Sequence, residues 1–340
     1  MKRCKQTALS SGRKECEEGY RMKKLCPCIV SLCAGLLVWS SPHTAIGSGD
    51  INTGGKAVKK HIATLFYGAQ QGQIGLKSVP EKERLGPQSF AVDGEGNMYL
   101  CDTVNNKVQV ISPQGKLVTQ ISAKGYITDL AVDDTGNIVV LEESKKKLLL
   151  YGKGGALKNE IPIPSSLIPE KDGLKIQKGM VCLLSRNQTE YEVGRMVKEE
   201  LRTGLSKTEP VRGMTGAGGA LYRVRMESKD RGEVVIVSKD RNATRTMRLN
   251  LPRLVSIVFL GEDVKENIYL QVEQTRPEGK GINLRVLKMD PEGNVTASID
   301  NIPNNYASWT ACLLRVNDKG EIYQMLPTED AVELNMWKLQ

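Results

Sequence analysis

Apolar and polar residues alternate in short runs between residues 86 and 121, and turn-forming residues separate these runs. Each run has five or six residues, which favours half-buried β-strands over helices. The turns are rich in Gly, Asp, Asn and Pro, which tolerate positive φ or hydrogen-bond to nearby backbone. The predicted strands are Gln88–Val92, Asn97–Cys101, Lys107–Ser112 and Lys116–Ile121. A four-stranded antiparallel unit of this kind cannot bury both faces alone, so the pattern predicts neighbours of its own type.

The same pattern returns along the chain in more divergent form. A second unit extends from Tyr126 to Pro162, and its Asn137 lies 40 residues after Asn97, which is a period typical of repeated four-stranded units. Residues 199–219 contain many glycines and show no clear strand pattern. The further predicted strands are 174–177, 180–185, 191–197, 221–226, 233–237, 244–251, 254–260, 267–274, 282–289, 294–302, 308–316, 321–326 and 332–338.

Short motifs in the first unit resemble an NHL repeat, the blade unit of six-bladed β-propellers. They are Gly86-Pro87, Ala91-Val92-Asp93, Gly96-Asn97, Cys101-Asp102, Asn105-Asn106, Val108–Val110 and Gly115. The resemblance is close over residues 86–121, partial over 126–163 and only in outline elsewhere. It implies a propeller fold, but it does not imply one activity, since a fold hosts many unrelated functions.

The number of strands predicts how the ring closes. The last unit has three predicted strands before the chain ends, and the strand Ile62–Tyr67 has no partner near it in the sequence. Pairing this strand with the last unit would complete six blades and remove the open sheet edges that promote aggregation. The predicted fold is therefore an all-β, six-bladed β-propeller of four-stranded antiparallel blades, closed by an N-terminal strand in the last blade.

The N-terminus has a different composition. Lys23 and Lys24 precede an uncharged apolar run from Leu25 to Trp39, which is shorter than the about 20 residues of a membrane span. This order is typical of a secretory signal, so we expect export to a periplasmic or extracellular location and no transmembrane span in the mature chain. The expected divisions are a disordered stub or misplaced start at 1–21, a signal peptide at 22–47, a linker at 48–61 and the propeller at 62–340.

Much of the positive charge belongs to this leader. The whole chain has a net charge of +9, but the first 47 residues hold eight basic and three acidic residues, so the rest has a net charge of +4. A mildly positive, mixed surface keeps a protein soluble and gives little support to a nucleic-acid partner. The basic clusters lack interleaved aromatic residues, so we expect solvated turns and strand faces. They are Lys145–Lys147, Arg223 with Arg225, and Arg241 with Arg245 and Arg248.

Candidate catalytic residues are few. The chain has two histidines, His43 and His61, whereas zinc or histidine-based catalysis usually needs more than one imidazole in a site. Three cysteines follow the leader, each within an apolar run, so we expect buried free thiols and no disulfide framework. They are Cys101, Cys182 and Cys312. No cofactor is expected.

Acidic residues at the predicted turns allow two interpretations. One is turn stabilisation, because Asp accepts hydrogen bonds from backbone groups that follow it. The other is a calcium or lactone-hydrolysing site in a central channel. These residues are Asp93, Asp102, Asp133, Asp290 and Asp318. The NHL resemblance favours the first interpretation, since Asp93 and Asp133 occupy matching positions.

Two long segments, 68–85 and 199–219, exceed what a simple connection requires, and loops of this length are often functional. Their polar residues favour recognition of a protein or a glycan. The candidate binding residues are Gln70, Gln73, Lys77, Arg84, Arg202, Lys207 and Arg212. The predicted function is an exported NHL-like binding scaffold, and the alternative is a propeller hydrolase or lyase with a carboxylate-bound divalent cation in the channel.

Overall fold

A computed structural model describes residues 57–78, 80–81, 83–163, 171–185, 188–197, 200–202 and 211–339. The stub expected at 1–21, the signal peptide expected at 22–47 and the candidate binding residue Lys207 lie outside these residues. Within the described part of the chain every regular element is a β-strand, and no helix there is long and apolar enough to cross a membrane.

The strands form six antiparallel sheets, each made of consecutive segments of the chain apart from β1. The first blade contains β2 (Ser89–Val92), β3 (Met98–Asp102), β4 (Lys107–Ile111) and β5 (Leu117–Ser122). The second contains β6 (Ile127–Val132), β7 (Ile138–Glu142), β8 (Lys147–Tyr151) and β9 (Leu157–Pro162). The third contains β10 (Lys171–Gln177), β11 (Met180–Ser185), β12 (Thr189–Val197) and β13 (Glu200–Arg202), with β14 (Val211–Arg212) also paired to β12.

The remaining three blades follow the same scheme. The fourth contains β15 (Met214–Thr215), β16 (Leu221–Ser228), β17 (Arg231–Val237) and β18 (Thr244–Asn250). The fifth contains β19 (Leu254–Glu262), β20 (Ile268–Thr275), β21 (Ile282–Met289) and β22 (Val295–Ile302). The sixth contains β23 (Leu314–Val316), β24 (Glu321–Pro327), β25 (Ala331–Leu339) and β1 (Ala57–Phe66).

The first strands of successive blades contact one another around a ring. Strand β2 contacts β6, β6 contacts β10, β19 contacts β23, and β23 returns to β2. The third and fourth blades meet through β12 and β15, and the fourth and fifth meet through β16 and β19. The first strand of each blade is therefore innermost, and the fold is a six-bladed β-propeller, as the sequence predicts.

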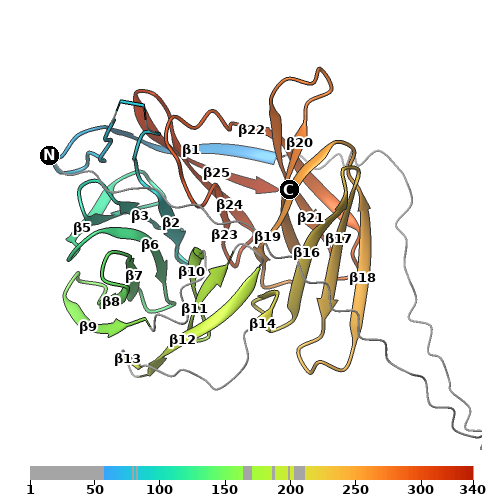
Figure 1. Cartoon of the computed structure of the whole chain (residues 1–340), viewed down its shortest axis with the longest axis horizontal. Coiled ribbons are helices and arrows are strands. Elements are labelled where there is room, and N and C mark those ends of the chain that lie inside the picture. Colours follow the sequence, from blue (N-terminus) through green and yellow to red (C-terminus); the bar gives the residue numbers. More distant parts are fainter. Residues whose placement is uncertain are drawn as a thin grey trace, which may run out of the picture. The chain divides into compact units, whose positions relative to one another are not determined.

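The predicted ring closure is confirmed. Strand β1 pairs antiparallel with β25 and forms the outer edge of the sixth blade, where Figure 1 shows the two strands side by side. The strand begins at Ala57, so residues 57–61 belong to the sheet and not to the linker expected at 48–61. The reason is that β25 extends to Leu339, which gives these residues backbone partners.

Apolar packing holds the blades together unevenly. The fourth and fifth blades share one large cluster of buried side chains, and the second and third blades share another. Among the described residues no such cluster joins the third blade to the fourth. Polar contacts connect these two blades instead. The side-chain amide of Gln188 donates to the Val224 carbonyl (2.6 Å) and accepts from the Val224 backbone N–H (3.2 Å). This junction also contributes residues to the central cavity described below.

Two predicted boundaries need correction. Residues 199–219 were expected to form one long loop, but they contain β13, β14 and β15, which are strands of two or three residues that pair with residues of β12 and β16. A strand was expected at 308–316, but only Leu314–Val316 pairs with β24. The residues before it fold against the segment that follows β1, where Trp309 pairs with Leu85.

Candidate functional site

The turn aspartates stabilise their own turns, as predicted for Asp93, Asp133 and Asp290. The Asp93 carboxylate accepts hydrogen bonds from the Asn97 backbone (2.9 Å), the Asn97 amide (2.8 Å) and the Tyr99 hydroxyl (3.0 Å). Bonds to the Asn four residues later recur at Asp133 and Asp290. The same arrangement at Asp263 was not singled out from the sequence. These oxygens are therefore already occupied by local donors.

Asp102 also stabilises a turn, and it holds the segment 68–85 in place. Its buried carboxylate accepts from the Asn105 backbone (3.2 Å) and from the backbone N–H of Gly75 (3.0 Å). The neighbouring Gln109 amide donates to the Gln73 carbonyl (2.6 Å), and Ile74 is completely buried in the core between the first and sixth blades. The segment is thus packed against the first blade rather than being a free insertion.

The candidate binding residues are distributed between two blades. Gln70 and Lys77 are exposed on the segment that follows β1, and the half-buried Gln73 uses its side chain to accept from the Gln70 backbone (3.1 Å). Arg202 lies in β13 beside Glu200 (3.3 Å). Arg212 lies in β14, and its carbonyl accepts from the Arg223 side chain (2.9 Å).

Arg84 is the candidate residue that lines a groove. The groove has a volume of about 320 Å³ and is formed by residues 83–84 and 306–310 with Leu313. The Trp309 side chain in it is 49% exposed, which is high for so large an apolar group. Arg84 forms an ion pair with Glu329, and the Thr310 hydroxyl donates to the Gln88 carbonyl (2.9 Å). Trp309 was not predicted as a binding residue, because the apolar pattern of residues 308–316 indicates a strand.

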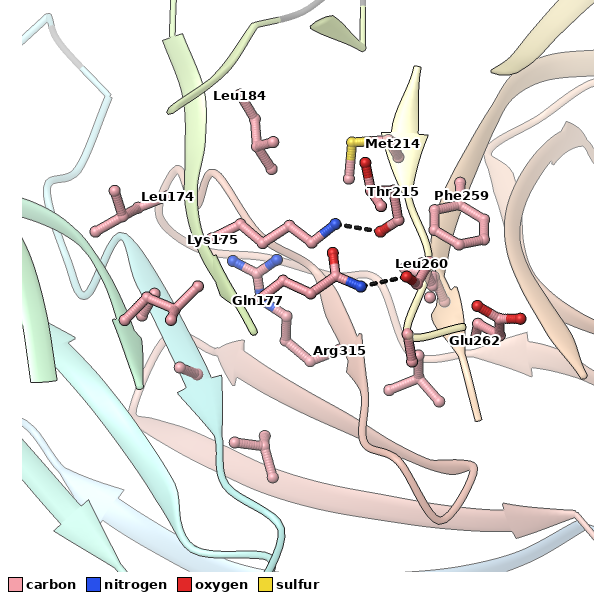
Figure 2. A pocket seen from close by; sticks show the side chains of 18 of the residues that line it. Leu174, Lys175, Gln177, Leu184, Met214, Thr215, Phe259, Leu260, Glu262 and Arg315 are labelled. Atoms are coloured by element: carbon pink, nitrogen blue, oxygen red, sulfur yellow. Dashed lines mark hydrogen bonds between the residues drawn. The ribbon is translucent and has the colours of Figure 1, made fainter. Parts of the chain in front are cut away.

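A second hollow lies in the centre of the ring. It has a volume of about 240 Å³ and is lined by residues from the innermost strands of all six blades, mostly towards the carboxyl ends of these strands. The groove, in contrast, lies at residues that precede the innermost strands. Figure 2 shows the side chains of Lys175, Gln177 and Arg315 extending from β10 and β23 into this cavity.

The polar side chains of the cavity differ in how fully they are bonded. Lys175 forms an ion pair with the buried Glu190 (2.8 Å) and donates to the Thr215 carbonyl, and Gln177 donates to the Gly216 carbonyl. Among the described residues, Arg315 makes one hydrogen bond, from its Nε to the Phe90 carbonyl (3.1 Å).

The Glu262 carboxylate lines the same cavity, and the buried Asp129 directly precedes the lining residue Leu130. Burial raises the pKa of the Asp129 carboxyl, and the Arg315 guanidinium partly opposes this shift. Asp129 accepts from the backbone N–H of Leu130 (2.8 Å). Glu262 accepts from the Tyr222 hydroxyl (3.0 Å) and from the Gly218 backbone (3.0 Å). Burial, followed by the charge of Glu262, raises the pKa of the Tyr222 hydroxyl, so Tyr222 stays a donor at physiological pH.

The cysteines and most of the basic clusters have the predicted surroundings. Burial raises the pKa of the Cys182 thiol to about 12 and that of the Cys312 thiol to about 11, which keeps both in the unreactive protonated form. The three buried free thiols are Cys101, Cys182 and Cys312. Arg225 and Arg248 are exposed on the fourth blade and pair with acidic side chains, whereas Arg245 is half-buried and donates to the Pro291 carbonyl (2.7 Å).

No group of three or more His, Cys, Asp or Glu side chains in the described part of the chain is arranged to hold a metal ion. His61 lies in β1, where its ring is close to the side chains of Asn335 (3.4 Å) and Thr64 (3.1 Å). Its neighbours are therefore those of a residue at the edge of a sheet.

Comparisons with known proteins found no matching family model and no matching curated protein. Among solved structures, a DUF4221 family member from Bacteroides vulgatus is 10% identical, with coverage of 84% of this chain and 98% of that one and a TM-score of 0.47. Hydrazine synthase of Kuenenia stuttgartiensis is 12% identical (76% and 77% covered, TM-score 0.46). A streptogramin B lyase is 10% identical (85% and 99% covered, TM-score 0.44). Similarities at this level carry no argument about function, so the NHL resemblance stays an expectation.

Proposed function

We propose that this protein is an exported binding scaffold that holds a protein or glycan partner in the groove beside Trp309. The observation that carries the proposal is the half-exposed Trp309 side chain next to Arg84. Tryptophan and arginine are enriched among the residues that dominate binding energy at interfaces, because each offers a large contact area with polar donors. The flat indole ring also suits stacking on a sugar ring.

The groove is supported by a fixed framework. Leu85 pairs with Trp309 through the backbone, and the Tyr67 hydroxyl donates to the Thr328 carbonyl (2.7 Å) next to Glu329, the ion-pair partner of Arg84. Burial, the largest cause, raises the pKa of the Tyr67 hydroxyl to about 12, so this donor is retained at physiological pH. A surface that is ordered before binding loses less conformational entropy when a partner docks.

Export is the second part of the proposal and rests on the basic, apolar and polar order of residues 22–47. N-terminal sequencing of the protein from its native host should find a mature chain that begins between Ile46 and Gly49. Recovery of a mature chain that retains residues 22–45 would reject cleavage of a signal peptide.

The alternative, a hydrolase or lyase with a divalent cation in the channel, has less support. It needs carboxylates from several blades directed at one point with free oxygens. In the described structure, the Asp93, Asp133 and Asp290 carboxylates are bonded to their own turns, and both oxygens of Glu262 accept hydrogen bonds. Calcium or magnesium that raises the melting temperature at micromolar concentration would favour the alternative.

Point variants of the groove test the scaffold proposal. Replacement of the whole segment 68–85 would remove the buried Ile74 and disturb the core, so Trp309→Ala and Arg84→Ala are better probes. Tyr126→Ala, at an exposed aromatic residue just before the second blade, is the control for Trp309, and Arg276→Ala, at an exposed arginine after β20, is the control for Arg84. Arg202→Ala tests the other candidate segment separately. Partners are identified by pull-down from the extracellular fraction and on a glycan array, and affinities are then measured by calorimetry.

We expect Trp309→Ala and Arg84→Ala to weaken binding about 10-fold or more, as residues that dominate an interface do, while both controls bind normally. If Trp309→Ala and Arg84→Ala fold and bind the partner as tightly as their controls, the role of the groove is overturned. A loss confined to Arg202→Ala would move the binding surface to the third blade.

A further inference from the structure

The central cavity is chemically different from the groove and lies towards the other ends of the innermost strands, so its role is independent of the scaffold function. We propose that it binds a small organic monocarboxylate with an apolar body. In this arrangement the carboxylate is held by Arg315, with Lys175 on the facing blade, and the apolar body packs against Met214, Phe259 and Leu260.

The first step is the position of the two cations. Lys175 lies on β10 of the third blade and Arg315 on β23 of the sixth, and both line the cavity. Blades three places apart in a ring of six face each other, and Figure 2 shows the two side chains entering the cavity from different strands. Because Lys175 is already paired with Glu190, Arg315 supplies most of the attraction for an anion in this cavity.

The second step is the unused bonding capacity of Arg315. A guanidinium has five N–H donors, and in the described structure Arg315 uses one of them, its Nε donor to the Phe90 carbonyl. Its two terminal nitrogens have no hydrogen-bond partner among the described residues and are not fully buried. They are therefore accessible to a ligand in the cavity. Two parallel donors on one planar group match the two oxygens of a carboxylate.

The third step is that the carboxylates in and beside the cavity are already hydrogen-bonded within the protein. Asp129 accepts from the backbone N–H groups of Leu130 and Leu174. Glu190 accepts from Lys175 and also from the Thr215 backbone (2.8 Å) and hydroxyl (2.6 Å). Glu262 accepts from Tyr222 and Gly218. None of these carboxylates is hydrogen-bonded to the terminal nitrogens of Arg315 in the described structure.

The fourth step is the size and lining of the cavity, which select the rest of the ligand. A volume of about 240 Å³ suits a small organic molecule rather than a folded peptide or an oligosaccharide. Much of the wall is apolar, including Met214, Phe259 and Leu260. Lys175 is already paired with Glu190, so a second negative charge on the ligand would meet no unpaired cation among the described lining residues, and a monocarboxylate fits better than a dicarboxylate.

The experiment uses the chain that begins at Ser48 and measures binding by calorimetry and ligand-observed NMR. The probes are 4-methylpentanoate and phenylacetate, with the corresponding amides and inorganic phosphate as comparisons. The variants are Arg315→Gln, which removes the charge, and Val132→Phe, which fills the cavity from the wall of the second blade without changing charge. Arg276→Gln, at an exposed arginine after β20, is the control.

We expect the carboxylates to bind the unmodified chain, and the amides and phosphate to bind about 10-fold or more weakly. Arg315→Gln should weaken carboxylate binding about 10- to 100-fold, Val132→Phe should abolish it, and Arg276→Gln should leave it unchanged. If Arg315→Gln fails to fold, Val132→Phe alone decides whether the ligand occupies the cavity.

The proposal is overturned if neither carboxylate binds at concentrations up to about 10 mM, the limit of weak specific binding. It is also overturned if Val132→Phe binds as well as the unmodified chain. Phosphate that binds as tightly as the carboxylates would show a simple anion site without recognition of an apolar body, which also contradicts the proposal.

Discussion

Closure of the ring by β1 can be tested with two adjacent residues of that strand. Leu65 is 7% exposed and belongs to the buried cluster between the sixth and first blades, whereas Phe66 is 65% exposed. Alternate residues of a strand point to opposite faces, so this difference exists only if β1 is docked in the register observed with β25. Leu65→Ala and Phe66→Ala therefore form a matched pair.

The expected magnitudes differ clearly. Leu65→Ala removes three buried carbon atoms, which cost about 0.8 kcal/mol each in lost burial, and it leaves a cavity in the cluster, so we expect a loss of about 2–5 kcal/mol. Phe66→Ala removes an exposed ring and should cost less than about 1 kcal/mol. A loss of 2–5 kcal/mol is a large part of the about 5–15 kcal/mol by which a domain is stable.

The assay is urea unfolding of the chain that begins at Ser48, followed by far-UV circular dichroism and intrinsic fluorescence, with the free energy of unfolding obtained by linear extrapolation. The two signals should change together if the ring unfolds as one unit. Equal losses for Leu65→Ala and Phe66→Ala, or a loss below about 0.5 kcal/mol for Leu65→Ala, would refute the docking of β1 in the last blade.

Three further predictions concern turns and thiols. A Cβ at Gly115 (φ +79°) would lie 2.2 Å from the Ile62 carbonyl oxygen. Gly115→Ala should therefore lower the free energy of unfolding in urea by more than about 1 kcal/mol. Gly154→Ala, where a Cβ would meet open space, is the control and should lower it by about 0.5 kcal/mol or less. Burial tends to raise the pKa of the Asp263 carboxyl, but hydrogen bonds, foremost from Asn267, hold this pKa below its usual value. The stability that the ionised carboxylate contributes is therefore present at pH 7 and lost as pH falls below about 4. Asp263→Ala should then destabilise the protein less at pH 3 than at pH 7, and an equal loss at both would contradict this. The three buried thiols of the propeller should react with a thiol reagent at pH 8 only after unfolding. Fast labelling of the native chain would show that these thiols are exposed. These thiols are Cys101, Cys182 and Cys312.

Much of the candidate site could not be predicted from the sequence. Arg84 was identified because it belongs to a long polar segment, but Trp309, its neighbour in the groove, was assigned to a strand. The sequence did not indicate Lys175 or Arg315 as candidate residues, since a single cation within a strand is a common pattern. They line one cavity only because the ring brings β10 and β23 together around its centre.

The sequence alone determined the features that depend on neighbouring residues. Period-two alternation predicted most of the strands, and the Asp-to-Asn spacing at Asp93 and Asp133 predicted turns that bond to their own backbone. The unpaired strand near Ile62 and the three strands of the last unit then implied closure, because open sheet edges are unfavourable.

Only the tertiary structure decided the features that depend on residues distant in the sequence. Strands β14 and β15 have two residues each and carry no periodic signal, and they exist because residues of β12 and β16 pair with their backbone. Ile74 is buried in a segment that reads as a polar loop, because Asp102 and Gln109 bond to its neighbours. These contacts join residues that lie apart in the sequence, and a local pattern of residues contains no information about which distant groups will meet.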